Sequence, residues 1–179
     1  METTLMTKCL FEFIGTLVLV LLGDGVVAST VLKRSKGYGG GWIVITMAWG
    51  LAVMCGVLIA GPYSGAHLNP AVSVGLAVAG SFPWAYVPGY VAAQLLGGFC
   101  GAVLVYLYYK DHFDATDDPA TKLGVFCTMP AIMDKPRNLF CEVVGTFLLV
   151  FVILVIGNEQ NTPEIGMGSL GSFPVTMLI

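Results

Sequence analysis

Long apolar runs alternate with short polar stretches along this chain. Four long apolar runs occupy residues 9–32, 42–60, 84–108 and 139–156. A helix needs about 20 such residues to cross a bilayer, so each run is long enough, or nearly so, for one transmembrane helix. A further apolar run opens at residue 173 and continues to residue 179. The pattern predicts an all-α membrane protein in which residues 1–179 form one transmembrane domain.

A shorter apolar run over residues 69–80 predicts a helix that does not span. A helix of this length covers roughly half of a hydrocarbon core of about 30 Å. Asn69 is a preferred N-cap, and Pro70 suits the first helical turn because its missing N–H is not needed there. The helix is therefore expected to begin inside the membrane. The alternative is a turn followed by an ordinary helix start.

The segment before this half-helix, residues 64–68, reads Ser-Gly-Ala-His-Leu. Irregular backbone at membrane depth is tolerated only where it is buried in protein or lines a water-filled cavity. The expected pore-lining groups are therefore the backbone carbonyls of Gly65, Ala66, His67 and Leu68, together with the side-chain amide of Asn69. This is the arrangement of half a pore for a neutral, hydrogen-bonding solute.

An internal repeat relates the first and fourth spans. Glu12 and Glu142 each begin a Glu-x-x-Gly-Thr motif, at an offset of 130 residues. The two copies enter the membrane in opposite directions, which is the plan of inverted-repeat transport proteins. Each glutamate is expected to accept hydrogen bonds from N–H groups of a re-entrant loop, the alternative being a protonated glutamate in a helix–helix contact. The repeat also predicts a second half-helix near position 199, so that the second half-pore is missing from these residues.

Composition narrows the possible functions. The chain is 56% hydrophobic and 11% charged, against about 25% charged residues in soluble domains. It has no basic face for nucleic acid. Five cysteines stand at no metal-ligand spacing, and two histidines come with no paired carboxylates or nucleophile–base set. The sequence therefore predicts no metal, no cofactor and no enzymatic activity.

Together these motifs resemble the major intrinsic proteins, the family of aquaporins and glycerol facilitators. The resemblance rests on both Glu-x-x-Gly-Thr motifs, on residues 64–72 and on Gln94 in the third span. It implies six spans and two half-helices around one pore per subunit, four subunits, and cytoplasmic termini. It also implies that one set of residues supports the pore. These residues are Pro70, Ala71, Glu12, Glu142 and Gln94.

Within that family the chain is most similar to bacterial glycerol uptake facilitators. Trp49 matches their aromatic selectivity position, and Val53 lies one helical turn further along and extends the apolar wall. The resemblance implies a passive, homotetrameric channel for glycerol and other small neutral solutes, with some water permeation, spanning the lipid bilayer of a bacterial plasma membrane. The alternatives are a truncated, non-conducting fragment of such a channel and a water-selective aquaporin.

The distribution of positive charge predicts a different orientation. One Lys or Arg lies on the side of the N-terminus and seven lie on the opposite side. The positive-inside rule would place the N-terminus outside the cell, whereas the resemblance implies a cytoplasmic N-terminus.

Overall fold

The computed structural model describes residues 3–157 and 173–178, and within these residues the chain is helical with no strand. The elements in order are α1 (Leu5–Val31), α2 (Gly41–Ser64), α3 (Pro70–Val78), the short 3-10 helix η1 (Trp84–Tyr86), α4 (Val87–Tyr108), α5 (Lys110–Ala115), α6 (Pro119–Gly124), α7 (Lys135–Ile156) and α8 (Phe173–Thr176). Helices α1, α2, α4 with η1, and α7 are long and apolar enough to cross a membrane. The all-α membrane fold expected from the sequence is therefore confirmed.

Three of the spanning helices extend beyond the apolar runs that predicted them. α1 begins at Leu5 rather than near residue 9, because the Thr4 hydroxyl accepts a hydrogen bond from the Thr7 N–H at 3.2 Å. α7 begins at Lys135 rather than near residue 139, because the Asp134 carboxylate caps its first turn. α2 continues to residue 64 instead of ending near residue 60. Hydrophobicity alone misses these polar or proline-containing ends.

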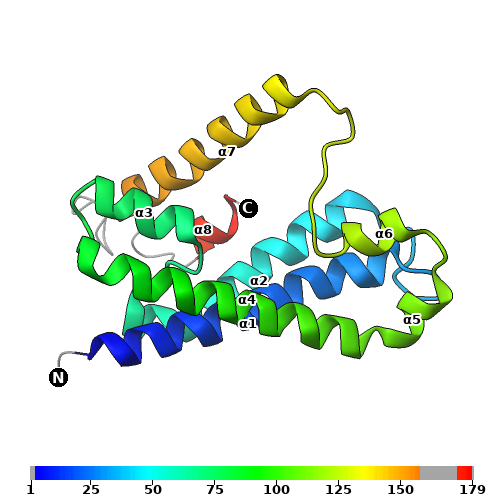
Figure 1. Cartoon of the computed structure of the whole chain (residues 1–179), viewed down its shortest axis with the longest axis horizontal. Coiled ribbons are helices and arrows are strands. Elements are labelled where there is room, and N and C mark those ends of the chain that lie inside the picture. The colour runs from blue at the N-terminus through cyan, green and yellow to red at the C-terminus, as the bar shows by residue number, and fades with distance from the viewer. Residues whose placement is uncertain (1–2, 158–172, 179) are drawn as a thin grey trace.

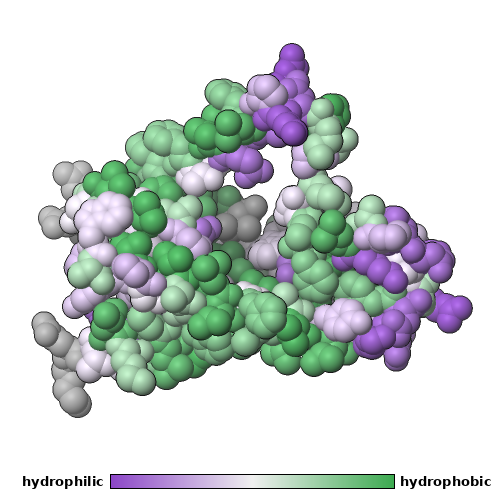
Figure 2. Space-filling model, viewed as in Figure 1, coloured by the Kyte–Doolittle hydropathy of each residue, from purple (hydrophilic) through white to green (hydrophobic). Residues whose placement is uncertain are grey.

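Helix α1 is the centre of the bundle and packs against both α2 and α4. Figure 1 shows these three helices side by side, with α3 and α8 between them and α7. α7 contacts α3 and α8, and none of its residues is buried. The space-filling view shows a largely apolar outer surface and a hollow between α7 and the other helices (Figure 2). The apolar outer surface suits contact with lipid chains.

The contact between α1 and α4 depends on glycines that allow the two backbones to approach closely. A Cβ added at Gly101 would lie 2.7 Å from the carbonyl oxygen of Leu17. A Cβ added at Gly97 would overlap the carbonyl oxygen of Phe13. Small residues provide such contacts in membranes, where no hydrophobic force drives one apolar helix against another.

The polar stretch after α4 contains α5 and α6 and docks on the end of α1. The buried Thr116 hydroxyl accepts a hydrogen bond from the Lys33 N–H at 2.9 Å. Phe113 and Val125 join Ala28 and Leu32 in a small buried cluster. These contacts hold residues 124–129 beside the C-terminal half of α1.

An exposed ion pair joins the same two segments. The Lys33 Nζ and the Asp117 carboxylate lie 2.8 Å apart. The hydrogen bond from Lys33 holds the pKa of Asp117 below its usual value. Any stability from this shift is therefore present above the ordinary aspartate pKa and is lost as the pH falls through the lowered one. Because both groups are exposed, the pair contributes little beside the buried contacts.

The close helix contact gives a testable prediction. Gly97→Ala should lower the free energy of unfolding by about 1–3 kcal/mol, since the new methyl group meets main-chain atoms of α1 that cannot move aside. The measurement is the thermal unfolding midpoint in detergent. Gly98→Ala is the matched control, because a Cβ there lies 3.8 Å from its nearest neighbour, Val20. Equal midpoints for the two variants would contradict this account of the contact.

Candidate functional site

The half-helix expected from the sequence is α3, and Asn69 caps it. The Asn69 Oδ1 accepts a hydrogen bond from the Ala71 N–H at 2.8 Å, and Pro70 is the first helical residue. The helix ends at Val78, and Gly80 follows in a left-handed conformation with a φ of 74°. α3 therefore has nine residues, about half the length of a span.

The segment that leads into α3 has an unusual backbone. Gly65, Ala66 and Leu68 have φ values of 86°, 52° and 54°. The left-handed conformation is unfavourable for residues with a side chain, by roughly 1–2 kcal/mol each. Ala66 and Leu68 can therefore hold it only because other groups fix the chain there.

The carboxylate of Glu12 fixes this segment. Its Oε1 accepts hydrogen bonds from the Ser64 hydroxyl at 2.6 Å and from the His67 N–H at 2.9 Å. Its Oε2 accepts from the Leu68 N–H at 2.7 Å and from the Gln94 amide at 2.8 Å. The side chain is fully buried. The hydrogen bonds expected between Glu12 and the re-entrant backbone are therefore present, and four donors satisfy the buried carboxylate.

A second part of this network holds the His67 ring. Gln94 also donates to the Ser73 hydroxyl at 3.0 Å, and Ser73 lies 3.0 Å from the His67 Nδ1. Because Gln94 donates to Ser73, the serine proton is left for His67 Nδ1 or for the Asn69 carbonyl, which is 3.4 Å away. The network thus ties α4 to α3 and orients the ring.

Sequence reasoning missed three members of this network. Ser73 is fully buried in α3, four residues after Asn69, and its position in an apolar run is the signal that was available. Ser64 ends α2 and donates to Glu12. The Tyr90 hydroxyl donates to the Ser64 carbonyl at 2.8 Å, and its ring packs against His67. Only the fold reveals that Tyr90 reaches the end of α2.

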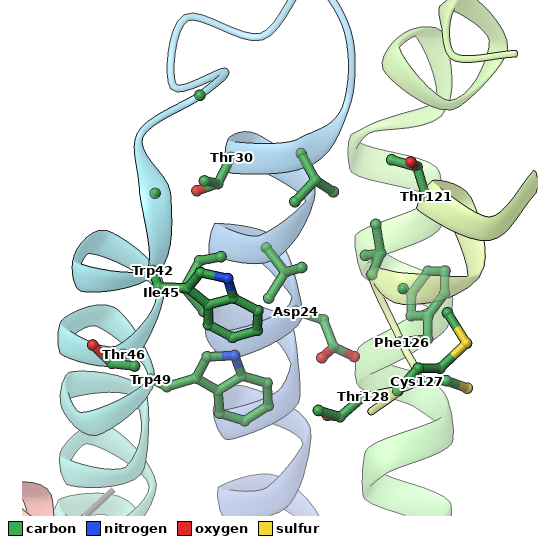
Figure 3. Close-up of a pocket in the computed structure, with 17 residues that line it drawn as sticks. Asp24, Thr30, Trp42, Ile45, Thr46, Trp49, Thr121, Phe126, Cys127 and Thr128 are labelled. Atoms are coloured by element: carbon green, nitrogen blue, oxygen red, sulfur yellow. The ribbon is translucent and has the colours of Figure 1, made fainter. Parts of the chain in front are cut away.

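Two cavities meet at Trp49. The smaller, of about 210 Å³, is lined by Trp49, Val53 and residues 66–69 among others. The larger, of about 690 Å³, is lined by Trp49 together with Trp42, Asp24 and residues 124–129 among others. Figure 3 shows the two indole rings one above the other, with Asp24 beside them. Trp49 therefore lies between the larger cavity and the N-terminus of α3.

The position of Trp49 depends on a glycine in α1. A Cβ added at Gly23 would lie 2.6 Å from the Trp49 ring. The absence of a side chain at Gly23 therefore allows the indole to lie directly against α1.

Not every predicted residue joins this site. Gly65 is exposed and lines neither cavity; it is the cap that follows α2, and the lining of the smaller cavity begins one residue later, at Ala66. Glu142 lies on α7 with an exposed side chain and has no hydrogen-bond partner among the described residues. The repeat predicts its partners on a second half-helix near position 199, outside the described residues.

These features define a class: a multi-pass helical membrane protein with a re-entrant half-helix capped by an Asn-Pro-Ala sequence. Comparison with protein families matches residues 1–179 to the family described as "Major intrinsic protein". The chain belongs to this family, as the motifs indicated.

Individual relatives agree with this assignment. The chain is 56% identical over 155 residues to the "Probable glycerol uptake facilitator protein" of Thermotoga maritima, covering 87% of this chain and 66% of that protein. It is 50% identical over 157 residues to the "Glycerol uptake facilitator protein" of Bacillus subtilis, covering 88% of this chain and 57% of that protein. The chain thus spans about two thirds of the first relative's length and less of the second's.

A solved structure confirms the aquaporin-like fold. The aquaglyceroporin from Plasmodium falciparum superposes with a TM-score of 0.79 at 32% sequence identity, covering 98% of this chain and 70% of that chain.

The Glu12 network gives a second prediction. In Glu12→Gln one acceptor oxygen becomes an NH₂ group that faces existing donors, so at least two buried N–H or O–H groups lose their partner. The free energy of unfolding should fall by about 2 kcal/mol or more. Thr16→Val is the control in the same helix, since the buried Thr16 hydroxyl has no partner among the described residues. Thermal unfolding in detergent measures both, and a Glu12→Gln midpoint as high as that of Thr16→Val would refute the role given to Glu12.

Proposed function

We propose that this protein is a passive channel for glycerol and other small neutral solutes, with some water permeation. The observation that carries the proposal is the position of Trp49 between two cavities, one of which leads to the capped end of α3. The names of the relatives from Thermotoga maritima and Bacillus subtilis, both glycerol uptake facilitators, support the same solute.

The chemistry of the smaller cavity suits a polyol. Trp49 and Val53 provide an apolar wall for its CH groups. The backbone of residues 66–68 provides hydrogen-bonding groups for its hydroxyls. A polyol carries both kinds of surface, whereas water carries only the second, so the tryptophan favours a glycerol channel over a water-selective one.

Asn69 completes the polar side of the path. Its Oδ1 is engaged by the Ala71 N–H, and its NH₂ group has no protein acceptor among the described residues. The NH₂ group is therefore available to donate to a passing hydroxyl. The positive end of the α3 dipole lies at the same place, which disfavours cations and protons. This combination supports selectivity for neutral solutes.

The oligomeric state and the location that we propose are those implied by membership of this family. We propose that the channel works as a homotetramer in a bacterial plasma membrane, with Pro70, Ala71, Gln94 and both repeat glutamates supporting its pores.

Replacement of Trp49 tests the proposed selectivity. Trp49→Phe should lower the ratio of glycerol to water permeability by roughly threefold or more, because the smaller ring provides less apolar contact for the polyol and more room for water. The measurement is stopped-flow light scattering of proteoliposomes that contain the full-length protein. An unchanged ratio would exclude Trp49 from the selective constriction.

A native cysteine tests whether the larger cavity belongs to the solute path. Cys127 is exposed and lines this cavity. A charged mercurial should attach there and reduce glycerol flux severalfold, and Cys127→Ser should abolish the inhibition. Cys141→Ser is the matched control, since Cys141 is also exposed but lies on α7 and lines neither cavity. Inhibition that persists in Cys127→Ser would place the solute path elsewhere.

A further inference from the structure

A second carboxyl group of α1, that of Asp24, has no assigned role. Asp24 is 7% exposed and lies in a helix long and apolar enough to cross a membrane. An ionisable side chain at such a place is unfavourable in lipid, and it persists where it pairs with another group or faces a water-filled cavity.

The described residues offer Asp24 no partner. No hydrogen bond or ion pair of its carboxyl group is found among them, in contrast to Glu12, which receives four hydrogen bonds. The residues lining the larger cavity include no Lys, Arg or His. Figure 3 shows the carboxyl group directed away from α1, beside Thr128. Its oxygens are therefore available to whatever occupies the cavity.

Two threonine hydroxyls of the same cavity already donate hydrogen bonds to backbone carbonyls. The Thr30 hydroxyl donates to the Val26 carbonyl at 2.7 Å, and the Thr46 hydroxyl donates to the Ile43 carbonyl at 3.2 Å. A carboxyl group also presents two acceptor oxygens to a solute, whereas a hydroxyl group presents one. Asp24 is therefore the principal side-chain acceptor that this cavity presents to a solute.

Asp24 also lies close to Trp49 at the wall of the larger cavity. Gly23, the preceding residue, packs directly against the Trp49 ring. Both residues line the same cavity. A solute that donates a hydroxyl to Asp24 consequently lies close to the indole that separates the two cavities.

We propose that Asp24 is a specificity-determining residue that accepts hydrogen bonds from the hydroxyls of a polyol before the solute passes Trp49. The ligand class is a small neutral molecule with several hydroxyl groups. The inference rests on the proposed function and adds a selective contact outside the constriction itself.

The test compares Asp24→Leu with Asp24→Asn in the full-length protein in proteoliposomes. Leucine has the same branching at Cγ, with two bulkier methyl groups and no acceptor, whereas asparagine is close in size to aspartate and keeps one acceptor oxygen. Asp24→Leu should lower the ratio of glycerol to water permeability by about fivefold, the equivalent of one net hydrogen bond. Asp24→Asn should lower it less. Water flux in the same vesicles reports the amount of folded channel, and Thr16→Val controls for the loss of a buried polar group from α1 away from the cavity.

Each possible result for the Asp24 variants either supports or overturns the role proposed for Asp24. An equal fall in the ratio for both variants also supports the inference and assigns the contact to the charge of the carboxylate. An unchanged ratio in Asp24→Leu overturns the inference, and so does a parallel fall of glycerol and water flux, which indicates a structural role. If the unaltered protein carries no glycerol at all, the proposed function itself fails, and this result is distinct from the others.

Discussion

The site depends on one buried carboxylate. Glu12 receives hydrogen bonds from two backbone N–H groups, one hydroxyl and one amide, and so satisfies donors that lipid cannot satisfy. These bonds join α1, the end of α2, the segment before α3, and α4. The left-handed backbone at Ala66 and Leu68 is held by this contact. A short helix can therefore begin in the middle of a membrane without leaving the N–H groups of the segment before it unpaired.

The same helix organises the apolar side of the site. α1 contacts α4 through glycines of α4, and its own Gly23 allows Trp49 of α2 to lie against it. Asp24 follows directly and faces the larger cavity. α1 thus provides three things: the carboxylate that supports the re-entrant segment, the glycine surface against which the indole packs, and a carboxyl group that faces the larger cavity. The two acidic residues of this helix differ because Glu12 is surrounded by donors and Asp24 is not.

The polar segment that contains α5 and α6 forms part of the cavity wall by packing against α1. α5 and α6 dock on the end of α1 through Thr116 and the cluster around Phe113, so residues 124–129 line the larger cavity. A stretch that the sequence describes only as polar is therefore part of the cavity wall. The exposed ion pair between Lys33 and Asp117 is secondary, because water screens it.

The sequence by itself determined the spans, the half-helix and its Asn69 cap, because apolar run length and capping chemistry are local properties. It also predicted that Glu12 serves the re-entrant backbone, since a buried charge at membrane depth needs donors. Only the tertiary structure decided that Ser64, Ser73 and Tyr90 complete this network, that Gly65 lies outside the cavity, and that Asp24 and Trp49 share one. These relations join residues far apart in the chain, and they depend on how closely the helices pack. Glycine contacts set that distance, and the fold alone decides which helix each glycine meets.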